Sequence, residues 1–172
     1  MRWREKLTKA AGDNYIAVST NGATDTTDTL MLVVNANRFD LLSHKELTNI
    51  NIHQYSRPPL EATLRDKSTG QVFKIMVNHL ERKNKQGRHK QAAMLNAYIK
   101  TIDQPFVAMG DYNFDWDLNQ GSNYRDKGYD LLTENNIVSW VKPTHMIKTS
   151  CAKAFNSILD FAFVNSLVKS SR

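Results

Sequence analysis

The chain has 172 residues, 41% of them hydrophobic and 23% charged, which predicts one globular domain over residues 1–172. Its 7 glycines, 4 prolines and 1 cysteine exclude a low-complexity chain, an internal disulfide and a zinc site made of several thiolates. The net charge of +6 favours polyanionic partners such as nucleic acid.

The first half of the chain predicts a short helix and then a series of strands. The helix is expected at Trp3–Ala11, and Leu30–Val34 is an unbroken apolar run typical of a strand covered on both faces. The segments around the turn DKSTG predict a β-hairpin with Gly70 in the turn. Strands or extended segments are expected, in chain order, at Tyr15–Ser19, Leu30–Val34, Arg38–Leu42, Leu47–His53, Leu60–Arg65 and Gln71–Val77.

The second half of the chain alternates between helical and extended patterns. Helical periodicity predicts a helix at Gly87–Ile102, and a second helix is expected at Tyr124–Asn136. Strands are expected at Pro105–Met109, Ile137–Val141 and Ile158–Val164. This mixture predicts α/β or α+β layers rather than a repeated strand–helix–strand array.

The sharpest chemical signal is the sequence GDYNFD, directly after the apolar strand Pro105–Met109. Asp111 and Asn113 are two residues apart, so on an extended segment their side chains point the same way. Asp111 offers an acceptor for a water proton or a metal ion, and Asn113 offers a donor to a phosphoryl oxygen. The alternative is an Asx-type turn that closes the strand, because Asp and Asn are ordinary turn residues.

Two further residues combine a reactive side chain with an apolar strand. His79 follows the strand FKIMV and can donate to a phosphate or act as an acid or base, although a structural hydrogen bond is the commoner role. Asp160 lies within the apolar strand ILDFAFV, where a carboxylate needs a partner unless it faces solvent at an edge.

A basic segment follows His79 in the sequence ERKNKQGRHK. Its cations Arg82, Lys83, Lys85 and Arg88 are candidate contacts to the phosphates of a nucleic acid. The alternative is a solvated loop and helix start. Cations near a helix N-terminus gain nothing from the helix dipole, which favours a functional reason for them.

The order of these motifs resembles the endonuclease/exonuclease/phosphatase superfamily, whose members include DNase I. An apolar strand ends in Asn-His-Leu, a helix follows, a strand leads into GDYNFD, and Ser-Ile-Leu-Asp-Phe comes later. The sequences DTLMLVV from Asp28 and SRPPL around Arg57 extend the resemblance, which covers Asp28 to Val164. It implies a DNase I-like sandwich of two mostly antiparallel sheets flanked by helices.

The resemblance also implies a role for each candidate residue. Asp111 would orient or deprotonate the attacking water, and Asn113 would bind the phosphoryl oxygens. His79 would bind the phosphate or assist protonation and would itself be oriented by Asp28, while Arg57 would stabilise charge in the transition state. Asp160 would orient a second, C-terminal histidine, and Mg²⁺ or Mn²⁺ would polarise the phosphate.

Two features of the family pattern are missing from this sequence. The N-terminal asparagine and the glutamate that is the main metal ligand are not found, and no Asp-His pair occurs. The resemblance therefore implies a partial domain that lacks both ends, with Asp111 as the one candidate metal ligand. Because the family's terminal strands pair inside its sheets, their absence predicts exposed strand edges.

The leading hypothesis is a metal-dependent phosphodiester hydrolase, most plausibly a nuclease that acts on nucleic acid. The alternative is an impaired fragment or pseudo-enzyme that binds nucleic acid or a partner without turnover. A lipid or inositol phosphohydrolase ranks lower, because no segment suited to a membrane surface stands out. No apolar run is long enough to span a membrane and no secretory signal is visible, so a cytoplasmic location is the default expectation.

Overall fold

The computed structural model describes residues 14–21, 29–52, 57–120 and 124–168, together with Lys6, Lys9 and Gly12. The expected helix at Trp3–Ala11 lies almost entirely outside these residues, and so does Asp28. Within the described residues the strands form a two-stranded sheet and a six-stranded sheet. The small sheet is an antiparallel hairpin of β1 (Tyr15–Ser19) and β2 (Met31–Asn35).

The large sheet has the strand order β3-β4-β5-β6-β8-β7. The pair β5–β6 is parallel, and the other neighbours are antiparallel. Parallel neighbours need a crossover connection, which the helix α2 provides. The bounds are β3 Phe39–Glu46, β4 Leu60–Asp66, β5 Val72–His79, β6 Phe106–Asp117, β7 Ser139–Trp140 and β8 Ser157–Val164.

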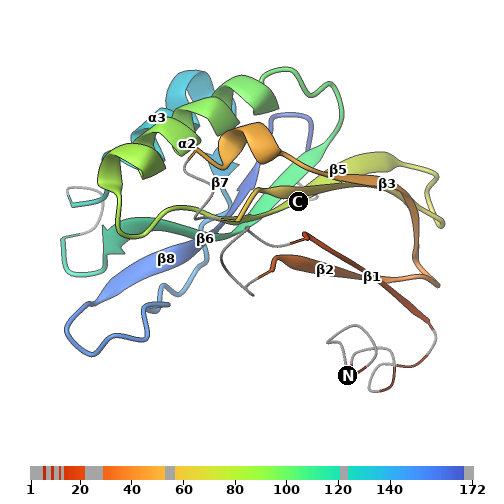
Figure 1. Cartoon of the computed structure of the whole chain (residues 1–172), viewed down its shortest axis with the longest axis horizontal. Helices are drawn as coiled ribbons and strands as arrows, with labels where there is room; N and C mark the ends of the chain where they lie inside the picture. Colours follow the sequence, from red (N-terminus) through yellow and green to blue (C-terminus); the bar gives the residue numbers. More distant parts are fainter. Residues whose placement is uncertain are drawn as a thin grey trace.

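Two helices and a hairpin cover opposite faces of the large sheet (Figure 1). The helices α2 (Lys85–Ile99) and α3 (Lys127–Thr133) lie on one face, and the hairpin β1–β2 lies on the other. Short 3₁₀ turns lie at Thr48–Ile50 and Glu134–Asn136. The chain therefore builds three layers in the order helix, sheet, hairpin.

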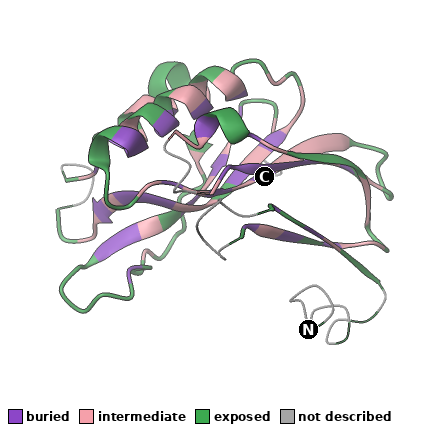
Figure 2. Ribbon diagram, viewed as in Figure 1, coloured by how far each residue is buried: buried purple, intermediate pink, exposed green. Residues whose placement is uncertain are grey.

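The helix α2 begins and packs as its sequence dictates. The side chain of Asn84 caps its N-terminus by accepting a hydrogen bond of 2.9 Å from the backbone N–H of Gly87. Its buried face carries Gln91, Ala92, Leu95 and Ile99, spaced by one, three and four residues. Figure 2 shows this buried stripe turned toward the sheet.

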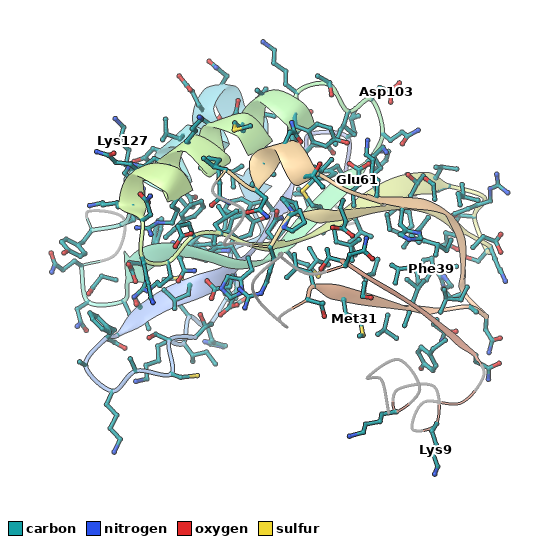
Figure 3. All side chains as sticks on the ribbon, viewed as in Figure 1. Lys9, Met31, Phe39, Glu61, Asp103 and Lys127 are labelled. Atoms are coloured by element: carbon teal, nitrogen blue, oxygen red, sulfur yellow. The ribbon has the colours of Figure 1, made fainter. Side chains whose placement is uncertain are left out.

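The core between the helices and the large sheet is rich in aromatic rings. In β6 and β8 alternate residues point into it, and their rings pack at centroid distances of 5.0–6.1 Å, mostly in tilted or edge-on pairs. Side chains fill the space on both sides of the sheet (Figure 3). The aromatic residues buried here are Phe106, Tyr112, Phe114, Trp116, Phe161 and Phe163.

A smaller core lies between the hairpin and three strands of the large sheet. It consists of aliphatic residues of the hairpin packed on β3, β4 and β5. Among the described residues, this cluster includes no member of β6 or β8. Its buried members are Val18, Leu30, Leu32, Val34, Leu60, Ala62 and Leu64.

Three sequence-based predictions of local structure are wrong. Leu30–Val34 is not covered on both faces, because the hairpin lies at the surface and leaves Val33 38% exposed. The part of the expected segment Leu47–His53 that the structure describes is not extended: β3 runs on to Glu46, and a 3₁₀ turn follows at Thr48–Ile50. Pro105–Met109 does not end before GDYNFD, because β6 continues to Asp117 through an irregular stretch.

Candidate active site

Three titratable side chains lie side by side on neighbouring strands of the large sheet. His79 at the end of β5 pairs in register with Asp111 of β6, and Asp111 pairs with Asp160 of β8. Residues opposite each other in neighbouring strands point to the same face, so the three side chains form a row. This row lies on the face that the hairpin covers only in part.

Arg57 joins the row through His79. One of its guanidinium nitrogens, Nη1, lies 3.1 Å from Nδ1 of His79. Because arginine can only donate, Nδ1 accepts, and this assigns the ring proton of the neutral imidazole to Nε2. Nε2 in turn lies 3.7 Å from Oδ2 of Asp111, beyond a direct hydrogen bond.

The environment of Asp111 makes its carboxylate more basic. Its half-buried position raises the pKa above the usual value of 3.8, and the neighbouring carboxylate of Asp160 raises it further. His79, the backbone N–H of Asn113 and Arg82 act in the opposite direction without cancelling the rise. A carboxylate of raised pKa is a better proton acceptor near neutral pH.

An irregularity of β6 begins directly after Asp111. Between the pairs Asp111–Asp160 and Trp116–Ile158 the register shifts, so that four residues of β6 face one residue of β8. Within this bulge Asn113 and Asp115 have positive φ angles of 55° and 45°. Bulges turn side chains out of the regular alternation and are common beside active sites.

Asn113 is buried and stabilises the bulge of β6 through two hydrogen bonds. Its side-chain Nδ2 donates to the backbone carbonyl of Leu80 at 3.0 Å, and its backbone N–H donates to Oδ1 of Asp111 at 2.9 Å. The second bond is an Asx turn, so the alternative interpretation of GDYNFD is correct for this local geometry. Asn113 is buried and binds the residue that follows His79, and a contact to a phosphoryl oxygen stays a prediction.

The basic segment after β5 divides into exposed and buried cations. Arg82 is exposed and donates to both carboxylate oxygens of Asp115, at 2.8 and 2.9 Å. Arg88 is buried instead, and its guanidinium binds Asp126 and the carbonyls of Glu81 and Arg82. Arg88 therefore holds the loop after β5 in place through buried hydrogen bonds. The prediction that Arg88 contacts phosphates together with Arg82, Lys83 and Lys85 is wrong, because its guanidinium is buried. Lys83 and Lys85 are exposed, as a phosphate-binding role requires.

The described residues contain no group of three or more His, Cys, Asp or Glu side chains that could hold a metal ion. Magnesium keeps much of its water shell and needs only one or two carboxylates. Asp111 and Asp160 form such a pair, so the donor chemistry fits a hydrated magnesium or manganese ion. Asp28, expected to orient His79, lies outside the described residues, and Arg57 is the described partner of Nδ1.

The layers and the strand order are those of a known fold: the chain has the DNase I-like fold of the endonuclease/exonuclease/phosphatase proteins. A family protein from Bacteroides thetaiotaomicron matches with a TM-score of 0.71 at 15% identity, over 95% of this chain. A mannosyl-6-phosphatase from Bacteroides thetaiotaomicron VPI-5482 matches with 0.71 at 14%, also over 95%. D. rerio TDP2 complexed with a single-strand DNA product matches with 0.71 at 20%, over 98%.

This likeness confirms the expected fold. The chain spans 67% of the mannosyl-6-phosphatase, 65% of the second Bacteroides protein and 68% of TDP2. No protein-family profile and no curated protein sequence matches the chain. In the described part of the chain, no helix has both the length and the apolar character needed to cross a membrane.

Proposed function

We propose that the chain is a phosphoester hydrolase and that its substrate is a phosphodiester of a nucleic acid. The observation that carries the proposal is the row of His79, Asp111 and Asp160 in register, with Arg57 bound to the His79 ring. The net charge of +6 and the exposed cations beside the row favour a polyanion. The likeness to TDP2 determined with a DNA product supports the same substrate class.

In the proposed reaction, Asp111 accepts a proton from a water molecule whose oxygen forms a bond to phosphorus. The position of Asp111 suits this role, because its carboxylate lies in register beside His79 and faces the same side of the sheet. The bond from phosphorus to the leaving oxygen breaks as the new bond forms, and the leaving oxygen takes a proton from solvent. Asp111 then returns its proton to solvent.

His79 and Arg57 act on the charge of the phosphoryl group. Nε2–H of His79 donates to a non-bridging oxygen, where negative charge grows in the transition state. Arg57 is a positioning residue for the ring through Nδ1, and its positive charge lies beside the same oxygens. A magnesium or manganese ion held by Asp111 and Asp160 would supply further polarisation of the phosphoryl group.

The test is nicking of supercoiled plasmid by the purified chain, with Mg²⁺, with Mn²⁺ and with EDTA. We expect nicking that needs the divalent ion and is lost in Asp111→Asn and His79→Asn. Asp103→Asn is the matched control, because Asp103 is an exposed aspartate on the loop before β6 and is not a member of the row. Nicking that survives Asp111→Asn unchanged would contradict the proposal.

A second candidate function is nucleic-acid binding without turnover. It is motivated by the finding that the described residues contain no cluster of three or more His, Cys, Asp or Glu side chains that could hold a metal ion. Under this alternative the folded chain binds DNA in a salt-dependent manner and leaves the plasmid intact under every metal condition. The same assay, combined with a binding measurement at two salt concentrations, separates the two functions.

A further inference from the structure

An exposed arginine, Arg82, is held in one position near the row of titratable residues. It follows the end of β5, in the loop that runs beside the end of β6 (Figure 1). One of its nitrogens, Nη1, donates to both carboxylate oxygens of Asp115, at 2.8 and 2.9 Å. In the described part of the chain, Nε and Nη2 of Arg82 have no hydrogen-bond partner. Arg82 therefore keeps unused donors although its guanidinium is already held in place.

The protein fixes Arg82 at its backbone as well as at its guanidinium. The backbone carbonyl of Arg82 accepts a hydrogen bond of 3.0 Å from Nη1 of the buried Arg88. The guanidinium is held by Asp115, whose two neighbours in the chain, Phe114 and Trp116, are buried in the aromatic core. Because both neighbours are anchored in the core, the backbone that carries the Asp115 carboxylate is fixed too.

Stability alone does not explain the ion pair between Arg82 and Asp115. The two side chains are 40% and 34% exposed, and ion pairs at such exposure contribute little to the stability of a fold. Asp115 also has a φ of 45°, a left-handed backbone conformation that costs free energy for a residue with a side chain. Strain that the resulting contact does not offset is typical of binding sites and active sites.

The positive charge of Arg82 acts on the row. Burial raises the pKa of Asp111, and the charge of Arg82 is one of the effects that oppose this rise, so the guanidinium lies within electrostatic range of that carboxylate. A phosphate bound at the row would lie in the same field. The planar guanidinium of arginine matches phosphate oxygens better than the point charge of a lysine does.

We propose that Asp115 is a positioning residue for Arg82, and that the unused guanidinium donors of Arg82 bind a phosphate oxygen of the nucleic acid at the row. Asp115 acts through Arg82 and does not itself touch the substrate. The inference rests on the proposed function for the position of the phosphate. It predicts the opposite sign from simple charge repulsion: removing a carboxylate that only repels phosphate would tighten binding, whereas removing one that positions Arg82 weakens it.

The experiment measures the affinity of the full chain for a fluorescently labelled single-stranded oligonucleotide, in EDTA so that metal-dependent hydrolysis does not contribute. The variants are Asp115→Asn, Arg82→Gln and the two combined. Asparagine tolerates the left-handed backbone, so Asp115→Asn removes the charge and keeps the local geometry. Asp103→Asn is the matched control, because it removes one negative charge from an exposed aspartate that has no printed contact with Arg82 and is not a member of the row. If circular dichroism shows that Asp115→Asn is misfolded, Asp115→Gly takes its place, because glycine adopts a positive φ without strain.

The affinities of these variants decide whether Asp115 acts through Arg82. We expect Arg82→Gln to weaken binding about tenfold, and Asp115→Asn to weaken it severalfold although it makes the chain more positive. Adding Asp115→Asn to Arg82→Gln should have no further effect, because the residue through which it acts is gone. Asp103→Asn should bind at least as tightly as the unaltered chain. Binding by Asp115→Asn as tight as that of Asp103→Asn, or an equal loss with and without Arg82, would overturn the inference.

The same variants keep this inference separate from the proposed hydrolysis. A chain that never nicks plasmid but loses affinity in Asp115→Asn, and only when Arg82 is present, would overturn the hydrolysis and leave the positioning role standing. A chain that nicks plasmid with Mg²⁺ and binds the oligonucleotide equally well with and without the Asp115 carboxylate would overturn the positioning role alone.

Discussion

The two faces of the large sheet differ although the same strands build both. On the helix side, β6 and β8 bury Tyr112, Phe161 and Phe163 in an aromatic core. On the other side the same two strands carry Met109, which is 37% exposed, and the row that includes Asp111 and Asp160. Because side chains alternate along a strand, one pair of strands provides stability on one face and candidate chemistry on the other.

This comparison shows why the chemistry lies where it does. The hairpin covers β3, β4 and β5, and its cluster does not extend over β6 and β8 within the described residues. Asp111 and His79 are therefore half-buried and Asp160 is exposed, which is enough burial to raise the pKa of Asp111 and still leaves access for a substrate.

The largest expected effect is that of Gly110→Ala, because residue 110 lies against the backbone of the neighbouring strand β5 and leaves no room for a side chain. A Cβ at this position would overlap the backbone carbonyl of Asn78 in the neighbouring strand, and φ is +137°. The parallel strands β5 and β6 approach closely here, one residue before the pair His79–Asp111. We expect the variant to lose folding, measured as the loss of a cooperative thermal transition in circular dichroism.

Gly70→Ala is the matched control for this substitution. Gly70 also has a positive φ, +73°, but a Cβ there meets nothing within 4 Å. Its expected cost is only the left-handed backbone strain of about 1–2 kcal/mol. If the two variants are equally stable, the close approach of β5 and β6 does not determine the fold.

The second prediction compares the two faces directly. Phe163→Ala, on the helix side, is expected to cost about 3–5 kcal/mol of unfolding free energy, because it leaves a cavity among packed rings. Met109→Ala, on the open side, is expected to cost less than half of that, because its side chain is 37% exposed. Urea denaturation of both variants measures the difference. Similar losses of unfolding free energy in the two variants would mean that the face carrying Met109 is as well packed as the face covered by the helices.

The sequence predicts secondary structure correctly wherever the local spacing of hydrophobic residues determines whether a segment is a strand or a helix. The strands Tyr15–Ser19 and Ile158–Val164 and the hairpin around Gly70 are found with small changes of bounds, and the helix at Gly87–Ile102 is found as Lys85–Ile99. The order of motifs from Asp28 to Val164 also predicted the fold, because motif order carries information about tertiary structure that no single motif has. His79, Asp111 and Asp160 are brought together by the pairing of β5, β6 and β8.

The sequence was a poor guide where distant residues decided the structure. Arg88 is buried because Asp126, 38 positions later, neutralises it, and nothing in the local basic segment indicates that partner. The bulge after Asp111 arises from the side chain of Asn113 binding the carbonyl of Leu80, 33 positions earlier. The ion pair of Arg82 with Asp115 was also missed, although both residues lie within the motifs that drew attention.

The third prediction concerns Asn113, whose side chain links the bulge of β6 to the residue that follows β5 by a hydrogen bond to the carbonyl of Leu80. Asn113→Ala removes the donor to the carbonyl of Leu80 and is expected to cost about 1–3 kcal/mol of unfolding free energy. Asn113→Gly removes the same donor but relieves the positive φ of 55°, so it is expected to be more stable than the alanine variant. Thermal melts of the two variants measure both contributions. If neither variant is destabilised, Asn113 is not a structural contact and its predicted phosphoryl role gains support.

The smallest expected effect has the opposite sign and comes from Asp111→Asn. Half-burial and the charge of Asp160 raise the pKa of Asp111, so the folded chain holds this proton more tightly than the unfolded chain does. Above that raised pKa the ionised carboxylate destabilises the fold, and a neutral amide of the same size removes the cost. We expect the variant to melt at a higher temperature than the unaltered chain at pH 7, measured by thermal unfolding in circular dichroism.

The same substitution has a pH dependence that identifies its cause. Below the usual aspartate value of 3.8 the carboxyl is protonated in both folded and unfolded chains, so the gain in melting temperature should vanish there. Asp103→Asn, at an exposed position, should show no gain at either pH. An Asp111→Asn variant that melts at or below the unaltered chain at pH 7 would show that His79 and Arg82 outweigh burial. If Asp111→Asn raises the melting temperature at pH 7 and also abolishes nicking, the carboxylate of Asp111 destabilises the fold and is needed for activity. Such a trade of stability for activity is typical of a functional site.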